Sequence, residues 1–189
     1  MNLKKHLQSF QGLVLDADGV FFDGKETRSV TLGNVRAISK TRDYRDGQGI
    51  SFLRALGIRI LFATGEDEPL RSIVDKMNAL PSCESGAWAP VECMTGLKSG
   101  KAAAVLAWAS RWAPAFPIVY MGDDRADCEA MRMTASNGSL VVIPADAQRC
   151  VRKYAGLTLS KRGGAGAIRE FAEMVCDARG IDEETLATS

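Results

Sequence analysis

The chain has 189 residues, of which 46% are hydrophobic and 25% are charged, and its formal net charge is +1. This composition is typical of a globular protein that buries a sizeable hydrophobic core. The near-neutral charge gives no electrostatic reason to expect binding to nucleic acid or to an anionic membrane. Five cysteines without close pairing and a single histidine argue against a zinc site. We therefore expect a cytoplasmic protein with free thiols, without a signal sequence or a membrane-spanning segment.

Apolar runs alternate with helical patterns along the chain. The predicted strands are short apolar runs at residues 12–15, 58–63, 118–121, 140–143 and 157–159. The predicted helices occupy residues 47–55, 69–77, 101–112, 124–134, 147–152 and 166–178. Strands separated by helices predict an α/β fold with a mainly parallel sheet, and ligands of such sheets bind beyond the carboxyl ends of the strands. Because no repeat or linker is visible, we expect residues 1–189 to form one domain.

Two segments break this alternation. Residues 20–44 contain the turn dipeptide Asp23-Gly24 among apolar residues, which predicts an antiparallel hairpin that projects from the first strand. Phe21 and Phe22 lie within it, and paired aromatic residues on a projecting ribbon favour self-association. Residues 80–99 are rich in Pro, Gly, Ser and Cys, so we expect an irregular surface insertion there.

The first predicted strand ends in two aspartates, Asp16 and Asp18, followed by Gly19. Alternation along an extended chain points the two carboxylates to the same side of the strand. Carboxylates placed together are costly unless a cation or a chemical role compensates them. The spacing alone leaves open whether this is a functional pair or an acidic strand end.

The second predicted central strand ends in Thr64-Gly65-Glu66. A hydroxyl and free backbone N–H groups at a turn between a strand and a helix are suited to holding a phosphate or a similar oxyanion. An ordinary Thr-Gly turn is the structural alternative.

A lysine at position 101 opens the predicted helix 101–112. A lysine there could reach a phosphate and neutralise charge in the transition state, although a solvated lysine at a helix start is the common alternative. The segment is not a nucleoside triphosphate-binding loop. Gly96 precedes Gly100 by only four residues and Ala102 follows the lysine, so the required spacing is missing.

The predicted strand 118–121 leads into Gly122-Asp123-Asp124-Arg125-Ala126-Asp127. A helix N-cap explains one of these aspartates but not all of them. Together with the aspartates of the first strand, Asp123, Asp124 and Asp127 form a set of hard oxygen ligands suited to Mg²⁺.

The motifs DxDGV, TG, Lys and GDDxxD, in this order, resemble those of the haloacid dehalogenase superfamily of phosphohydrolases over about residues 12–175. The resemblance implies a Rossmann-like three-layer sandwich, with the hairpin in place of a cap domain. It also implies that Asp16 is the nucleophile that forms an aspartyl-phosphate. Asp18 would be the general acid for the leaving alcohol and then the general base for water.

The same resemblance assigns the remaining catalytic and metal-binding roles. It implies that Thr64 hydrogen-bonds the phosphoryl oxygens and that Lys101 stabilises charge and positions the nucleophile. Mg²⁺ would cancel the repulsion between the phosphate and the attacking carboxylate. The implied metal ligands are Asp16, Asp123 and the backbone carbonyl of Asp18, with Asp124 and Asp127 supporting the metal shell and Lys101.

Segments 46–50 and 161–170 look like the branch of this superfamily that lacks a cap and dephosphorylates 2-keto-3-deoxy sugar acids. Members act on octulosonate 8-phosphate or nonulosonate 9-phosphate, generally as homotetramers in which one subunit's hairpin helps to close its neighbour's site. Glu66 stands where the octulosonate enzymes usually carry arginine, which favours the nonulosonate phosphatases. The implied substrate contacts are Gly65, Glu66, Lys76 and Arg162.

Several alternatives stay open at this point. Lys98 is the second candidate for the catalytic lysine, because the usual Asp-Lys pair is replaced by Gly100-Lys101 and the preceding loop is long. The chain could be a phosphatase for another small sugar phosphate, or a non-catalytic oligomerisation domain like that of some acylneuraminate cytidylyltransferases. A receiver-type signalling domain is disfavoured, since its acidic pair and its acceptor aspartate lie on separate strands.

Overall fold

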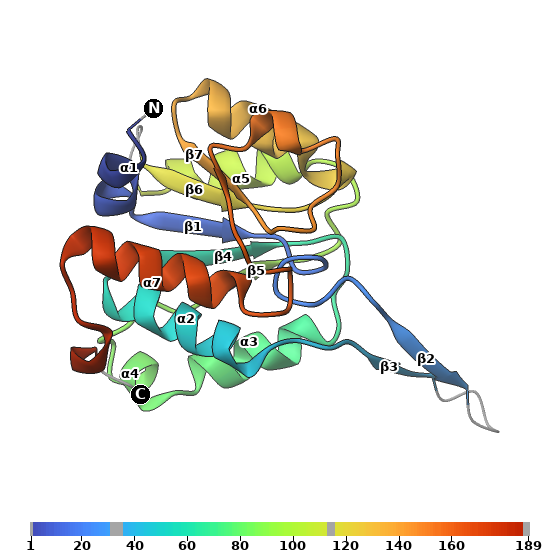
Figure 1. Ribbon diagram of the computed structural model, residues 1–189. Coiled ribbons are helices and arrows are strands. Elements are labelled where there is room, and N and C mark those ends of the chain that lie inside the picture. The colour runs from blue at the N-terminus through green and yellow to red at the C-terminus, as the bar shows by residue number, and fades with distance from the viewer. Residues whose placement is uncertain (1, 31–35, 113–115, 187–189) are drawn as a thin grey trace.

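The computed structural model describes residues 2–30, 36–112 and 116–186. A six-stranded parallel sheet with the order β5-β4-β1-β6-β7-β8 forms its centre (Figure 1). The strands of this sheet are β1 (Gly12–Leu15), β4 (Arg59–Ala63), β5 (Glu92–Met94), β6 (Ile118–Met121), β7 (Leu140–Ile143) and β8 (Leu157–Thr158). This arrangement confirms the predicted α/β fold.

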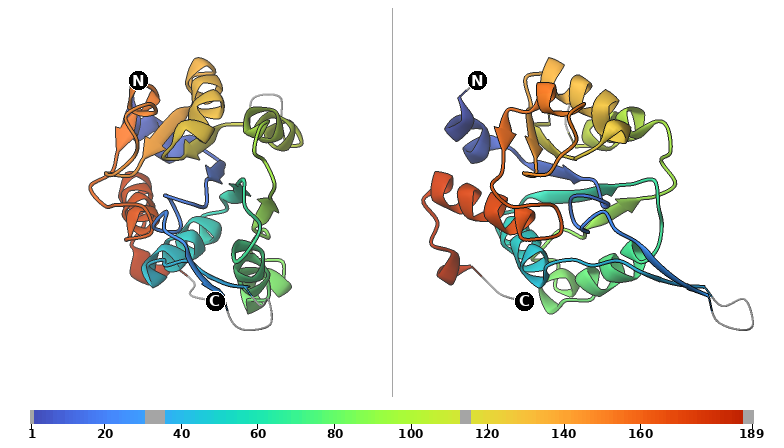
Figure 2. Two further views of the ribbon diagram at one scale, coloured as in Figure 1. Left: turned by 90° about the vertical axis from the view of Figure 1, so that its right-hand side faces the viewer. Right: turned by 45° about the vertical axis from the view of Figure 1, so that its right-hand side comes forward.

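Helices cover both faces of the sheet and make a three-layer sandwich (Figure 2). The helices are α1 (Leu3–Ser9), α2 (Tyr44–Ala55), α3 (Leu70–Asn78), α4 (Pro81–Glu84), α5 (Lys101–Ser110), α6 (Cys128–Ser136) and α7 (Ala167–Arg179). Short 3₁₀ turns are η1 (Arg125–Asp127), η2 (Arg152–Tyr154) and η3 (Glu183–Thr185). In the described part of the chain, none of the helices is long and apolar enough to cross a membrane.

Alternate side chains of β1 belong to two different apolar clusters. Leu13 and Leu15 are buried in the cluster that includes Phe171 of α7, whereas Val14 is buried with Trp108 of α5. A strand that is buried on both faces has a continuously apolar sequence, and for this reason β1 was predictable. Its central place between β4 and β6 puts the residues that follow it in the middle of the sheet's carboxyl edge.

The motif at residues 46–50 joins α2 to α7. The buried Asp46 carboxylate accepts hydrogen bonds from the backbone N–H groups of Gly166 (3.1 Å) and Arg169 (3.0 Å), so one helix caps the N-terminus of the other. Gly49 lies against α7 so closely that a Cβ there would stand 2.9 Å from the Cα of Arg169. The motif therefore holds two helices together.

The predicted hairpin is present as β2 (Thr27–Val30) and β3 (Arg36–Ser39), an antiparallel pair that projects from the body of the molecule (Figure 1). It begins later than expected. Phe21 and Phe22 are 0% and 1% exposed and pack in the core, with their ring centroids 5.1 Å apart. The expectation that these two aromatic residues drive self-association from an exposed ribbon was therefore wrong.

Two other local predictions were wrong. The segment 80–99 contains α4 and the edge strand β5, whose residues 92–94 pair with β4 although their sequence, Glu-Cys-Met, shows no apolar run. The predicted helix 147–152 is instead a series of turns that leads into η2. The backbone N–H of Gln148 there donates to the carbonyl of Asp123 at 2.8 Å, which attaches the segment to the loop after β6.

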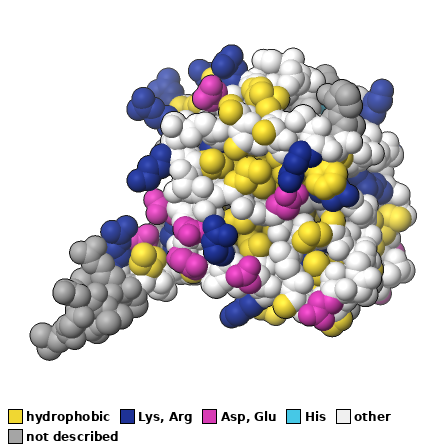
Figure 3. All heavy atoms as spheres, turned by 180° about the vertical axis from the view of Figure 1, so that it is seen from behind, with side chains coloured by type: hydrophobic (Ala, Val, Ile, Leu, Met, Phe, Trp, Pro, Cys, Tyr) yellow, Lys and Arg dark blue, Asp and Glu magenta, His cyan; other side chains and the backbone are white. Residues whose placement is uncertain are grey.

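Charges of both signs are mixed on the surface. On the face seen in Figure 3, Lys and Arg side chains are interspersed with Asp and Glu, and hydrophobic side chains lie between them. This mixture agrees with the net charge of +1 and leaves that face without a field of one sign.

Candidate active site

Asp16 and Asp18 follow β1 at the carboxyl edge of the sheet. Gly19 ends this segment with a φ of +79°, in the left-handed region that favours glycine. A Cβ on Gly19 would stand 2.0 Å from Oδ2 of Asp123, so only glycine lets the loop after β6 approach the loop after β1. The glycine in the DxDG motif thus brings the two acidic segments together.

Lys101 connects two of the buried carboxylates. Its Nζ lies 2.8 Å from Oδ1 of Asp16 and 2.9 Å from Oδ1 of Asp127. The three residues are at most 6% exposed. Burial by itself lowers the pKa of Lys101, but the adjacent charges of the two aspartates outweigh it and the pKa is raised. The Lys101 ammonium is therefore held charged beside Asp16. Lys98, the second candidate, is exposed and lines the pocket mouth.

Asp127 supports the loop after β6. Its Oδ1 also accepts a hydrogen bond from the hydroxyl of Tyr120 (2.8 Å), and its Oδ2 accepts from the backbone N–H groups of Asp123 (3.0 Å) and Asp124 (3.2 Å). Asp124 in turn caps η1 by accepting from the N–H of Arg125 at 2.5 Å. Both oxygens of Asp127 thus have protein partners, and these contacts fix the direction in which Asp123 points.

Asp16, Asp123 and Asp127 form an acidic cluster in which one oxygen of each lies within 4.8 Å of the others. Burial, followed by the charge of Asp127, raises the pKa of Asp16 to about 7 and that of Asp123 to about 8. Among the described residues, Oδ1 of Asp123 is buried without a hydrogen-bond partner. A buried oxygen without a partner, beside two other carboxylates, fits a hard divalent cation such as Mg²⁺.

Thr64 lies on the opposite side of β1, at the end of β4. It is 1% exposed, its backbone N–H donates to the carbonyl of Met94 and its carbonyl accepts from the N–H of Leu97, each at 3.0 Å. Its hydroxyl accepts a hydrogen bond from the N–H of Glu66 at 3.3 Å. These bonds fix the turn, and they depend on the unpredicted strand β5.

The predicted catalytic residues line one pocket of about 390 Å³ at this edge of the sheet. Seven carboxylic acids and two lysines are among its lining residues. The acids are Asp16, Asp18, Asp23, Glu66, Asp123, Asp124 and Asp146, and the lysines are Lys98 and Lys101. Such an excess of negative charge needs a cation before an anionic substrate is attracted.

The structure brings some of the predicted substrate contacts to this pocket and not others. Gly65 and Glu66 line it. Lys76 is on the exposed side of α3 and lines a separate pocket with Arg42 and Tyr44. Arg162 has a 73% exposed side chain and forms an ion pair with Asp146 at 3.1 Å, at the rim.

Sequence reasoning missed Tyr120, Lys40 and Asp146. Tyr120 lies within an apolar strand, where a core role is the natural interpretation, and burial raises its pKa well above the usual value. Lys40 forms an ion pair with Asp18 at 2.7 Å although no motif contains it. Asp146 follows β7, so the rule that polar groups after a parallel strand face the site could have found it.

Comparison with known proteins relates the chain to sugar acid phosphatases. No family model matches the chain. The 3-deoxy-D-manno-octulosonate 8-phosphate phosphatase of Haemophilus influenzae is 29% identical over 183 residues, which cover 94% of this chain and 89% of that protein. The structure of the cobalt-bound deoxy-D-mannose-octulosonate 8-phosphate phosphatase from the same species has a TM-score of 0.71 at 26% identity, covering 93% of this chain and 92% of that one.

A relative of another kind is the N-acylneuraminate cytidylyltransferase B of Danio rerio, which is 28% identical over 142 residues, 71% of this chain and 29% of that protein. The relatives support a phosphatase, and the fold and motifs of the chain are similar to those of the haloacid dehalogenase superfamily. Over most of its length the chain is similar to octulosonate 8-phosphate phosphatases.

Proposed function

We propose that the protein hydrolyses the phosphomonoester of a 2-keto-3-deoxy sugar acid through an aspartyl-phosphate on Asp16, with Mg²⁺ as cofactor. The observation that carries this proposal is the buried ion pair of Asp16 with Lys101 at the head of an acidic pocket. The named relatives favour octulosonate 8-phosphate as the substrate, whereas Glu66 favours nonulosonate 9-phosphate.

Asp16 is oriented for attack by its two hydrogen-bond donors. Its Oδ1 accepts from the backbone N–H of Ala17 at 2.7 Å and from the ammonium of Lys101 at 2.8 Å. In the described part of the chain, no protein donor is seen on its Oδ2, which is therefore the oxygen free to bond to phosphorus. As that bond forms, Lys101 and the hydroxyl and N–H groups of the Thr64 turn hold the phosphoryl oxygens.

Asp18 is the proposed general acid and general base. Its carboxyl group lines the pocket and is 35% exposed. As general acid, it donates a proton to the oxygen of the leaving alcohol when the P–O bond breaks. As general base, it then takes a proton from the water that attacks the phosphoryl group on Asp16, which releases phosphate and restores the carboxylate.

Mg²⁺ would be held by Asp16, Asp123 and the backbone carbonyl of Asp18, with Asp124 and Asp127 orienting the loop that carries Asp123. When bound, it supplies the positive charge that lets a carboxylate approach a phosphate dianion. The partnerless Oδ1 of Asp123 supports this assignment.

Gly65 and Glu66 are the proposed contacts to the sugar, because both line the pocket beyond Thr64. Lys76 lines a different pocket and Arg162 lies at the rim with Asp146, so in the described part of one copy neither is among the lining residues. We propose that the chain acts in the cytoplasm, consistent with its five free cysteines, as a homo-oligomer. The projecting β2–β3 arm supports assembly, and the tetramer of similar enzymes is the expected form.

A non-catalytic oligomerisation domain is the second candidate, and the likeness to a cytidylyltransferase favours it. A non-catalytic domain does not require the catalytic residues of a phosphatase. Asp16, Lys101 and Asp123 are all present here and lie together, which favours an enzyme.

Phosphate release from a panel of sugar phosphates in Mg²⁺, including the eight-carbon and nine-carbon keto acid phosphates, tests the proposal. We expect turnover of at least one keto acid phosphate and its loss on chelation of the metal. The variant Glu66→Arg should change the ratio of the two activities. A folded protein that releases no phosphate from any member of the panel would refute the enzyme assignment, and an unchanged ratio would refute the role of Glu66.

A further inference from the structure

A second lysine contacts the active-site acids, from outside every motif. The Nζ of Lys40 lies 2.7 Å from Oδ1 and 2.8 Å from Oδ2 of Asp18, so one ammonium engages both oxygens of the carboxylate. The side chain of Lys40 is 4% exposed and that of Asp18 is 35% exposed. Among the described residues, Lys40 is the cation in contact with Asp18.

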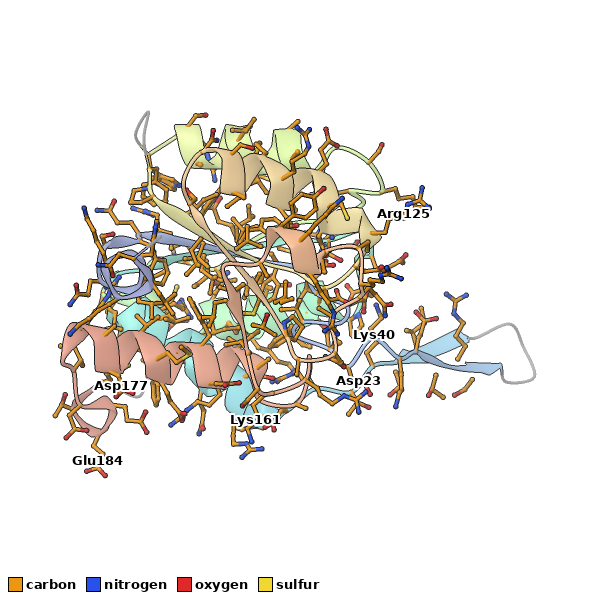
Figure 4. All side chains as sticks on the ribbon, turned by 45° about the horizontal axis from the view of Figure 1, so that its top comes forward. Asp23, Lys40, Arg125, Lys161, Asp177 and Glu184 are labelled. Atoms are coloured by element: carbon orange, nitrogen blue, oxygen red, sulfur yellow. The ribbon has the colours of Figure 1, made fainter. Side chains whose placement is uncertain are left out.

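The position of Lys40 is fixed by the chain around it. Lys40 comes directly after β3, where the projecting arm returns to the body. Its ammonium lies 5.7 Å from the ring centroid of the buried Phe22. The next residue, Thr41, accepts a hydrogen bond through its carbonyl from the N–H of Asp23 at 3.0 Å, which joins the two ends of the arm. Figure 4 shows Lys40 and Asp23 together at the base of the arm.

This ion pair differs from an ordinary surface pair. A lysine exposed to solvent loses side-chain entropy when it is held in one geometry and gains little. Here the lysine side chain is already buried, with its ammonium near the Phe22 ring, so the ion pair costs little additional side-chain entropy. The exposed member of the pair is the carboxylate, which faces the pocket. The buried Lys40 side chain thus contacts a carboxylate that is open to the pocket.

We propose that Lys40 is a positioning residue that fixes the orientation of the Asp18 carboxylate, and that the base of the β2–β3 arm is therefore part of the active site. The inference rests on the proposed role of Asp18 in proton transfer. Lys40 acts on Asp18 and not on the phosphoryl group, which is held by Lys101 and the Thr64 turn. Its removal leaves the nucleophile in place and lets the Asp18 side chain rotate.

Two substrates separate these effects. The leaving group of a sugar acid phosphate is an alkoxide that needs a proton, whereas the 4-nitrophenolate of 4-nitrophenyl phosphate leaves without one. We expect Lys40→Met to slow phosphorylation of Asp16 by the sugar acid phosphate about 10- to 100-fold in single turnovers, with KM changed less than about threefold. The same step with 4-nitrophenyl phosphate should change less than about threefold. Lys40→Arg should restore part of the loss.

Matched variants complete the test. Lys25→Met removes an exposed lysine just before β2, on the other chain segment of the arm, and should leave both rates unchanged. In an Asp18→Asn background, Lys40→Met should have no further effect, since a residue that acts through Asp18 is silent without it. If Lys40→Met fails to fold, Lys40→Gln replaces it in the same comparison.

Three outcomes would overturn the positioning role. Lys40→Met could slow phosphorylation equally with both substrates, or leave it at the wild-type rate. It could also slow phosphorylation in the Asp18→Asn background as much as in the wild type. Wild type is assayed first on the same two substrates. An inactive wild type refutes the proposed function, whereas an active wild type with an unaffected Lys40→Met refutes only this inference.

Discussion

Two lysine–aspartate pairs at one pocket are built in different ways. Lys101 lies at the start of a core helix between two buried carboxylates, Asp16 and Asp127. Lys40 lies at the base of a projecting arm and holds the half-exposed Asp18. The groups proposed to bond phosphorus and metal are thus held within the core, whereas the group proposed to move protons is held by a lysine at the base of the arm.

The difference has a physical basis. Attack on phosphorus requires a fixed line of approach, and buried strands and helices provide it. Proton transfer involves a leaving group and then a water molecule, so the carboxylate that serves both stays accessible to the pocket. The comparison predicts that changes in the first pair affect folding and catalysis together, while changes in the second affect catalysis alone.

The largest expected effect follows removal of the first lysine. Lys101→Met leaves Asp16 and Asp127 buried without a counter-charge, so we expect a loss of about 3 kcal/mol in the free energy of unfolding and a fall in turnover of about 10³-fold. Lys40→Met should cost less than about 1 kcal/mol, because its partner is open to solvent. Urea unfolding of both variants in EDTA measures the contrast. Similar losses of stability in the two variants would contradict it.

The next effect concerns pH and the metal. In the metal-free chain, burial raises the pKa of Asp16 to about 7 and of Asp123 to about 8, above their ordinary value of 3.8. The folded state then binds more protons than the unfolded state, so the stability contributed by these groups falls as pH rises from about 4 to about 8. Protons compete with Mg²⁺ for the same oxygens, so the gain in melting temperature from Mg²⁺ should grow between about pH 6 and about pH 8.

Thermal unfolding with Mg²⁺ or EDTA at each pH measures this gain, and the difference between the two curves removes the contribution of other titrating groups. Asp123→Asn is the control and should abolish the gain. A gain that is constant or falls with pH would show that Mg²⁺ binds elsewhere.

The smallest effect tests how much the loop after β6 depends on the core. Tyr120→Phe removes the hydroxyl that donates to Oδ1 of Asp127 at 2.8 Å. Lys101 and two backbone N–H groups remain on that carboxylate, so we expect a loss of about 1 kcal/mol in stability and less than about tenfold in turnover. Chemical denaturation and steady-state assays measure both. A loss as large as that of Lys101→Met would mean that the tyrosine is part of the catalytic set.

The sheet and the first lysine pair were predictable because local patterns carry them. β1, β4 and β6 are apolar runs with a polar residue one or two positions after the strand, and the carboxyl edge of a parallel sheet brings those residues together. Asp16, Thr64 and Asp123 were found in this way and Lys101 as the start of a predicted helix, and the structure places all of them in one pocket.

What the sequence did not reveal depends on tertiary contacts. Strand β5 has no apolar run and exists through its pairing with β4. Phe21 and Phe22 follow the acidic motif in what looked like an exposed ribbon, but the chain turns back into the core before the arm begins. Lys40 is separated from Asp18 by the whole arm, and only the closure of the arm's base brings them into contact.

The central claim is that Asp16 carries the phosphoryl group during turnover. Rapid acid quenching of the enzyme during hydrolysis of its best substrate, followed by peptide mass mapping, tests it most directly. We predict one phosphoryl group on the peptide that contains Asp16, formed and lost at rates that account for turnover, and none on the Asp16→Asn variant. An active enzyme that yields no phosphorylated peptide, or an Asp16→Asn variant that still turns over, would contradict the account.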